Sequence, residues 1–234
     1  MKNKRNKLIT FLFACILALG LIVAGLLVSL SVRTNGMLDD YSLVYRDEKY
    51  SIPVYIDGID VIKQDVSCGY AVIEMFSAWC GKDITEESLY SSYGKVVTST
   101  GKDFCKEMNK QFPEYTTTIH KYMKNTELID AVYNNLTNGV PVPFEWAALY
   151  GDVWTLHYSL IVGMDIPGNK VTIANPYGYY EELPLSEFLD RSALKKSQNL
   201  RVRSSITPRQ KTSISSTNSL GTTDSFLLST RMRS

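Results

Sequence analysis

The stretch KQDVSCGYAVIEMFSAWC, residues 63–80, contains the most informative pattern of the chain. After Gly69, apolar residues occupy positions 71, 72, 75, 76 and 79, which is the periodicity of a helix with one buried stripe. Gly81 follows at a position where helices commonly end. The stretch therefore predicts a helix that begins at Cys68 and carries a thiol at its N-terminus.

A cysteine at the start of a helix is a candidate nucleophile. The thiolate is the reactive form of cysteine, and the unpaired amides of a helix N-terminus stabilise negative charge, so we expect a lowered pKa for Cys68. Gly69, which has no side chain, leaves room for a substrate backbone. The alternative from position alone is an inert, half-buried cysteine.

Two polar residues in the second half of the chain complete a candidate site. His157 begins the apolar run HYSLIVGMD, and a neutral imidazole there can accept the thiol proton. Asn175 ends the strand-like run KVTIA and precedes a proline. In an antiparallel pair of strands around a turn at 167–169, both residues point toward the same end of the sheet, where an amide can orient the imidazole. The alternatives are a polar residue at a strand start and a turn residue before proline.

These blocks, in this order, resemble the papain-like cysteine peptidases, and most closely the C39 and C39-like branch. The matching segments are QDVSCGYAVIEMF, HYSLIVGMD and IANPYG, and the resemblance covers roughly residues 50–190. It implies that Cys68 is the nucleophile and His157 the base. It also implies that Asn175 orients the base and that Gln64 donates to the oxyanion hole. The gap between the glutamine and the cysteine is shorter than the family usually shows, and asparagine stands at 175 where C39 members more often carry aspartate.

The remaining patterns predict an α+β fold, with helices in the first half and an antiparallel sheet in the second. Helices are expected within 83–94 (N-cap Thr85), 102–112 and 125–139 (N-cap Thr126), with a short one within 183–194. Strands are expected within 140–149, 156–166 and 169–178, and a strand or extended entry segment within 50–64. Combined with the resemblance, this predicts a papain-like cysteine peptidase fold.

The N-terminus predicts a membrane segment. A basic leader at 1–7 precedes an uncharged stretch at 8–32. As a helix with a rise of about 1.5 Å per residue, these 25 residues are longer than the roughly 30 Å thickness of a bilayer core. A cleaved signal peptide is the alternative, although its apolar region is usually only about 7–15 residues. Basic residues are more numerous before the segment than after it, which places the N-terminus in the cytoplasm. We therefore expect a single-pass protein of the cell membrane whose catalytic domain lies outside the cytoplasm.

The composition of the other segments suggests the domain boundaries. Residues 33–49 form a polar stalk, residues 50–196 the C39-like peptidase domain, and residues 197–234 a basic, Ser/Thr-rich tail. That tail has too few apolar residues to offset the entropy of ordering it, so we expect disorder.

The net charge and the cysteine and histidine positions indicate which partners and cofactors to expect. A net charge of +1 gives no indication of nucleic-acid binding. Three of the four cysteines lie beyond the apolar segment, and with Cys68 assigned to catalysis we expect Cys80 and Cys105 to form a disulfide. The two histidines and four cysteines lack the spacing of a zinc site, so we expect neither metal nor other cofactor. His120, the second histidine, lies in a polar segment and is expected on the surface.

The sequence thus predicts a membrane-anchored, exported cysteine peptidase that cleaves a peptide or protein substrate through a thioester acyl-enzyme. Two other functions stay open. The same triad serves an amidase or a transglutaminase-like acyltransferase, which differs only in the acceptor. A papain-like domain with little catalytic activity, acting as a binding module at the cell surface, is the third.

Overall fold

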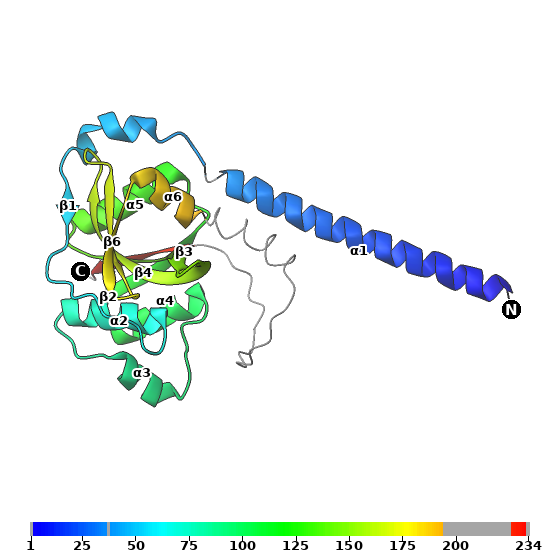
Figure 1. The fold of residues 1–234 in the computed structure, drawn as a ribbon, viewed down its shortest axis with the longest axis horizontal. Coiled ribbons are helices and arrows are strands. Elements are labelled where there is room, and N and C mark those ends of the chain that lie inside the picture. Colours follow the sequence, from blue (N-terminus) through cyan, green and yellow to red (C-terminus); the bar gives the residue numbers. More distant parts are fainter. Residues whose placement is uncertain (1, 37, 194–225, 233–234) are drawn as a thin grey trace. The chain divides into compact units, whose positions relative to one another are not determined.

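A computed structural model describes residues 2–36, 38–193 and 226–232 of the chain, which divides into two units, 1–38 and 39–234. The first unit is one helix, α1 (Lys2–Gly36), drawn in blue in Figure 1. Within it, Phe11–Ser29 is long and apolar enough to cross a bilayer by length and composition, a test that a signal sequence also passes. The helix is therefore a membrane anchor or a signal sequence.

The second unit is an α+β domain built around a seven-stranded antiparallel sheet (Figure 1). The strands run in the order β2-β7-β3-β4-β5-β6, and the short β1 pairs with β4. The strands are β1 (Val54–Tyr55), β2 (Tyr115–Lys121), β3 (Val142–Tyr150), β4 (Val153–Asp165), β5 (Lys170–Asn175), β6 (Tyr179–Leu183) and β7 (Phe226–Met232). The helices are α2 (Cys68–Trp79), α3 (Glu86–Tyr93), α4 (Gly101–Gln111), α5 (Asn125–Thr137) and α6 (Leu185–Ser192), with short 3-10 turns η1 (Ser42–Arg46) and η2 (Glu48–Tyr50).

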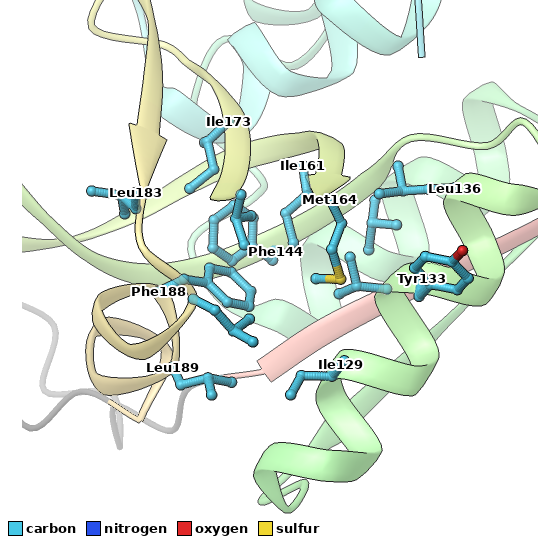
Figure 2. Packing of buried hydrophobic residues seen from close by; sticks show 14 of the residues in the cluster. Ile129, Tyr133, Leu136, Phe144, Ile161, Met164, Ile173, Leu183, Phe188 and Leu189 are labelled. Atoms are coloured by element: carbon cyan, nitrogen blue, oxygen red, sulfur yellow. The ribbon is translucent and has the colours of Figure 1, made fainter. Parts of the chain in front are cut away.

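Each face of the sheet has its own hydrophobic core, because the strands are apolar on both sides. Helices α5 and α6 cover one face and α2 and α4 the other (Figure 1). In β4, Ile161 faces the first core and Leu160 the second, as expected for the two-residue period of a strand. Figure 2 shows the first core, where Phe144 of β3 and Phe188 of α6 meet side chains of α5.

The predicted helices are present, and their starts follow local capping chemistry. Thr85 caps α3, and the Ser67 side chain caps α2 by accepting from the backbone N–H of Tyr70. The predicted cap of α5 is wrong: α5 begins after Lys124, whereas Thr126 hydrogen-bonds to Asp39. That tertiary partner takes the hydroxyl that a cap would need.

The predicted stalk is wrong beyond Asp39, because the chain packs against the domain from that residue onward. Val44 and Tyr50 are both buried in the core shown in Figure 2. The side chain of Asp39 accepts a hydrogen bond from the Thr126 backbone N–H at 3.2 Å. Two apolar anchors within a polar stretch were too sparse a signal to predict this packing.

Three strands were not predicted: β2, β6 and β7. β7 lies within the segment expected to be disordered, and that prediction is wrong at residues 226–232; the rest of it, 197–225 and 233–234, lies outside the described residues. β7 pairs with β2 on one side and β3 on the other, so long-range backbone partners order a short apolar run, FLLSTRM, within a tail that is otherwise rich in Ser and Thr.

Candidate active site

Cys68 is the first residue of α2, as predicted. Its thiol is half-buried and is hydrogen-bonded by the backbone N–H of Tyr158, the residue that follows His157 in β4. α2 packs against β4 through the second core, which holds its N-terminus at this part of the sheet. The nucleophile candidate and the base candidate are thus brought together from positions 89 residues apart in sequence.

The electrostatics of the thiol differ from the expectation. Burial raises the pKa of Cys68, and the nearby carboxylate of Glu145 raises it further. The backbone N–H groups of Tyr158, Gly69 and Cys68 itself lower this pKa, but by less than burial raises it. The prediction of a lowered pKa is therefore wrong for the structure as it stands, because loss of solvent outweighs the helix N-terminus.

Gly69 has a different role from the one predicted. It is buried, and a Cβ there would lie 2.4 Å from Oγ1 and 2.8 Å from Cβ of Thr98. Thr98 itself is only 2% exposed. The space beside Gly69 is therefore filled by the protein, and the glycine permits this close approach instead of leaving room for a substrate.

His157 and Asn175 are directly hydrogen-bonded. His157 Nε2 lies 2.9 Å from Asn175 Oδ1, and both side chains are buried. The hairpin of β4 and β5 brings them to the same end of the sheet, as its turn at 167–169 predicts. The His157 ring also stacks on Tyr177, with ring centroids 4.0 Å apart. Burial lowers the pKa of His157 from 6.5 to about 4, so the imidazole is neutral at physiological pH.

Gln64 lies against the turn that follows Asn175. Its backbone N–H donates to the carbonyl of Pro176 at 2.8 Å. Its side-chain Oε1 is buried and has no hydrogen-bond partner among the described residues. Gln64 as a whole is partly exposed, and its unpaired atom is an acceptor, which suits a substrate N–H group.

Sequence reasoning missed Glu86, which holds the loop between Gln64 and Cys68. Its carboxylate, 4% exposed, accepts three consecutive backbone N–H groups, those of Asp65, Val66 and Ser67, at 3.0, 3.0 and 2.8 Å. In the sequence, Glu86 appears only as an acidic residue in the first turn of a helix. No local pattern indicates that it reaches back about 20 residues.

Four aromatic residues of β3 and β4 differ in their exposure: Trp146, Tyr150, Trp154 and Tyr158, of which Trp154 is half-buried. Trp146 and Tyr158 are buried and belong to the two cores. Tyr150 is 66% exposed, and its ring packs 5.0 Å from that of Tyr177, which covers the imidazole. Of these aromatics, Tyr150 is the one available to a substrate at the site.

The remaining cysteines and the second histidine lie outside the site. The expected disulfide is absent, and that prediction is wrong: the Cys80 thiol donates to Ser77 O and the Cys105 thiol to Thr117 O. Each thiol is satisfied by the backbone of a different segment. His120 is exposed on β2, as predicted.

An α+β domain with a cysteine at a helix start and a hydrogen-bonded His–Asn pair at one end of an antiparallel sheet has the papain-like cysteine peptidase fold. A family model matches residues 56–199, which is more than half of the chain, and the chain belongs to the Peptidase_C39 like family. Among the curated proteins, none matches the chain.

Proposed function

We propose that this protein is a cysteine peptidase that hydrolyses peptide bonds with Cys68 as nucleophile, His157 as base and Asn175 as the residue that orients the base. The observation that carries the proposal is the buried hydrogen bond between His157 and Asn175. The next residue, Tyr158, donates its backbone N–H to the Cys68 thiol. Nucleophile, base and orienting group are the three roles that the triad requires.

In the proposed reaction, His157 Nδ1 takes the thiol proton while Sγ of Cys68 attacks the substrate carbonyl carbon. The side-chain NH₂ of Gln64 donates to the resulting oxyanion. The C–N bond then breaks, the imidazolium returns its proton to the leaving amine, and a thioester remains on Cys68. Water then attacks the thioester carbonyl carbon while His157 accepts its proton, the C–S bond breaks to release the acid, and the imidazolium returns the proton to Sγ of Cys68.

The charge state of the resting pair supports proton transfer during attack. A raised thiol pKa together with a lowered imidazole pKa favours a neutral thiol beside a neutral imidazole over an ion pair. Nucleophilicity then depends on His157 acting as a general base when a substrate is bound.

Labelling with a peptidyl epoxide, which alkylates activated thiols, tests the nucleophile and the base. We expect the wild-type protein to be labelled, and Cys68→Ala and His157→Ala to lose the label. Cys105→Ala is the matched control, since that thiol is also half-buried but lies outside the site, and it should be labelled like the wild type. Equal labelling of the wild type and Cys68→Ala would refute the proposed chemistry.

Gln64→Ala tests the oxyanion hole. Removing one amide donor from an oxyanion hole typically costs about 10²–10³ in kcat, and we expect a loss of that order with KM nearly unchanged. The measurement is steady-state hydrolysis of a peptide amide. A wild-type kcat in Gln64→Ala would remove Gln64 from the mechanism.

The acceptor of the acyl group decides between hydrolysis and acyl transfer. Mass spectrometry of the products in the presence of a primary amine distinguishes them, because hydrolysis yields the free acid and transfer yields the amide. We expect the acid. A wild type that binds peptides but forms neither product would instead indicate a binding module.

We also propose that α1 anchors the protein in the cell membrane, with the N-terminus in the cytoplasm and the domain outside. The excess of basic residues before the apolar segment supports this orientation. Protease added to intact cells should then degrade residues 39–234 and leave an N-terminal tag protected. Protection of the domain would contradict the orientation, and recovery of a secreted chain starting after the helix would identify a signal sequence.

A further inference from the structure

The His157–Asn175 pair continues into a longer chain of polar contacts. Asn175 Nδ2 donates to Oε2 of Glu181 at 2.8 Å, and Nη1 of Arg191 donates to Oε1 of the same carboxylate at 2.6 Å. Glu181 belongs to β6 and Arg191 to α6, so elements that follow β5 in the chain act on the orienting residue. Neither residue belongs to the site that the sequence predicts.

Arg191 is held in a single place by contacts on several sides. It is 3% exposed, and its Nε donates to the carbonyl of Ala147 at 2.9 Å. Its guanidinium lies over the ring of Trp146, 3.8 Å from the centroid, and 5.3 Å from that of Trp154. An arginine fixed in this way presents a full positive charge to the carboxylate of Glu181.

An ionised carboxylate has no proton to donate, and this determines how Asn175 lies. The side-chain group of Asn175 that faces Glu181 must be its NH₂, so Oδ1 must face the opposite way. The backbone N–H of Tyr177, which can only donate, lies 3.0 Å from Oδ1 and independently requires the same orientation. Both neighbours therefore orient Asn175 so that its Oδ1, an acceptor, faces His157.

An acceptor at Nε2 selects one tautomer of the imidazole. A neutral imidazole carries one proton, and the hydrogen bond to Oδ1 of Asn175 keeps that proton on Nε2. Nδ1 of His157 is then unprotonated and able to accept a proton. The opposite tautomer would protonate Nδ1 and would leave no lone pair for the thiol proton.

We propose that Glu181 and Arg191 are positioning residues that set the tautomer of His157 through Asn175, and that they require asparagine instead of aspartate at position 175. The proposal rests on the proposed function, in which His157 Nδ1 is the base. An aspartate at 175 would place a second carboxylate against that of Glu181, and the repulsion would protonate one of them or push them apart. Asparagine at a position where the C39 branch more often has aspartate thus has a local electrostatic cause.

The first test is the tautomer itself, read from the ¹⁵N chemical shifts of His157 in the full-length, detergent-solubilised protein. The chain has two histidines, so His120→Gln leaves a single imidazole to observe. We expect the proton on Nε2 at neutral pH. A proton on Nδ1 in the wild type would overturn the proposal without any variant at 181.

The second test is a mutant cycle at positions 175 and 181. Glu181→Gln lets the side chain at 181 donate as well as accept, so the Tyr177 N–H alone still favours one orientation of Asn175. We expect a mixture of tautomers and a roughly 10–100-fold lower kcat with KM nearly unchanged. Asn175→Asp alone should lose more activity than that. In Asn175→Asp with Glu181→Gln, the glutamine amide donates to the new aspartate, and kcat should recover by at least about tenfold over Asn175→Asp alone.

Glu182→Gln is the matched control, because that residue adjoins Glu181 on the same strand and pairs with Lys170 at the surface; it should keep the wild-type tautomer and kcat. Unchanged tautomer and kcat in Glu181→Gln, or no recovery in the double variant, would overturn the proposal while leaving the proposed function intact. A wild type that has the Nε2 proton but no Cys68-dependent activity would do the reverse, refuting the function and not the tautomer.

Discussion

Burial shifts the pKa values of the Cys68 thiol and the His157 imidazole in opposite directions. Both groups lose solvent, and burial penalises the charged form of each: it raises the pKa of the thiol and lowers the pKa of the imidazole to about 4. The resting site therefore holds one proton on sulfur and a neutral base. Attack by sulfur and protonation of the leaving amine both require that this single proton be shared by the pair.

The pH dependence of activity follows from this sharing. Below about pH 4, His157 is protonated and cannot act as base. Above the raised pKa of the Cys68 thiol, the pair has lost its proton and cannot protonate the leaving amine. We expect kcat/KM for a peptide amide to be bell-shaped between these limits. The rate of iodoacetamide alkylation of Cys68, followed by mass spectrometry, should rise only toward the alkaline limb. A constant alkylation rate from pH 5 to pH 8 would show a preformed ion pair instead.

Gly69 shows how one missing side chain controls packing next to the nucleophile. In Gly69→Ala, the new Cβ would overlap the side chain of the buried Thr98, and overpacking of this kind costs about 1–3 kcal/mol. We expect that decrease in the free energy of unfolding, measured by urea titration in detergent. Thr98→Gly removes the atoms in conflict, so adding it to Gly69→Ala should recover part of the loss. Wild-type stability in Gly69→Ala would contradict this account.

At the scale of elements, α2 carries the nucleophile, but α3 holds the loop that leads to it. The segment from Asp65 to Ser67 is irregular. Its three backbone N–H groups donate to a side chain instead of to the backbone carbonyls of a helix or strand. Glu86, the first residue of α3, accepts all three. The backbone that leads to the nucleophile is thereby attached to α3.

Replacing that carboxylate tests this attachment. Glu86→Gln removes the charge and one acceptor oxygen, and hydrogen bonds to charged groups contribute about 1.5–3 kcal/mol, so we expect roughly that loss of stability together with slower epoxide labelling of Cys68. Glu87→Gln is the matched control, since Glu87 is the next residue and is exposed. Labelling of Glu86→Gln at the wild-type rate would mean that the loop is held by other contacts.

At the scale of the whole domain, a polar path crosses a sheet that is covered on both faces by apolar cores. His157, Asn175 and Arg191 are all buried within it, and each hydrogen-bonds to another member of the path or to backbone, although Nη2 of Arg191 has no partner among the described residues. A buried neutral histidine makes folding sensitive to acid, because the unfolded chain binds a proton more readily than the folded domain.

The effect of His157 on stability has a definite sign and pH window. Its pKa is 6.5 in the unfolded chain and about 4 in the folded domain, so stability falls as the pH decreases from 6.5 and the loss is complete below 4. The shift corresponds to about 3 kcal/mol. Unfolding free energies from pH 7 to pH 4 should show this loss in the wild type and lack it in His157→Gln. Parallel pH profiles for the two proteins would contradict the assignment.

Features that depend on local periodicity could be predicted from the sequence. Apolar spacing after Cys68 predicts α2, and the two apolar runs around the turn at 167–169 predict the hairpin of β4 and β5. Because strand direction reverses at that turn, the hairpin also places His157 beside Asn175. These inferences hold because helix and strand periods, capping and turns are set by neighbours in the chain.

Only the tertiary structure decided the features that depend on contacts between distant segments. The pairing of β7 with β2 and β3, the reach of Glu86 to the loop before α2, and the contact of Gly69 with Thr98 leave no local pattern. The same holds for the pKa of the thiol, because solvent exclusion depends on what packs over the group and not on its position in a helix. Burial was decided by the assembled fold, and burial outweighed the helix N-terminus at Cys68.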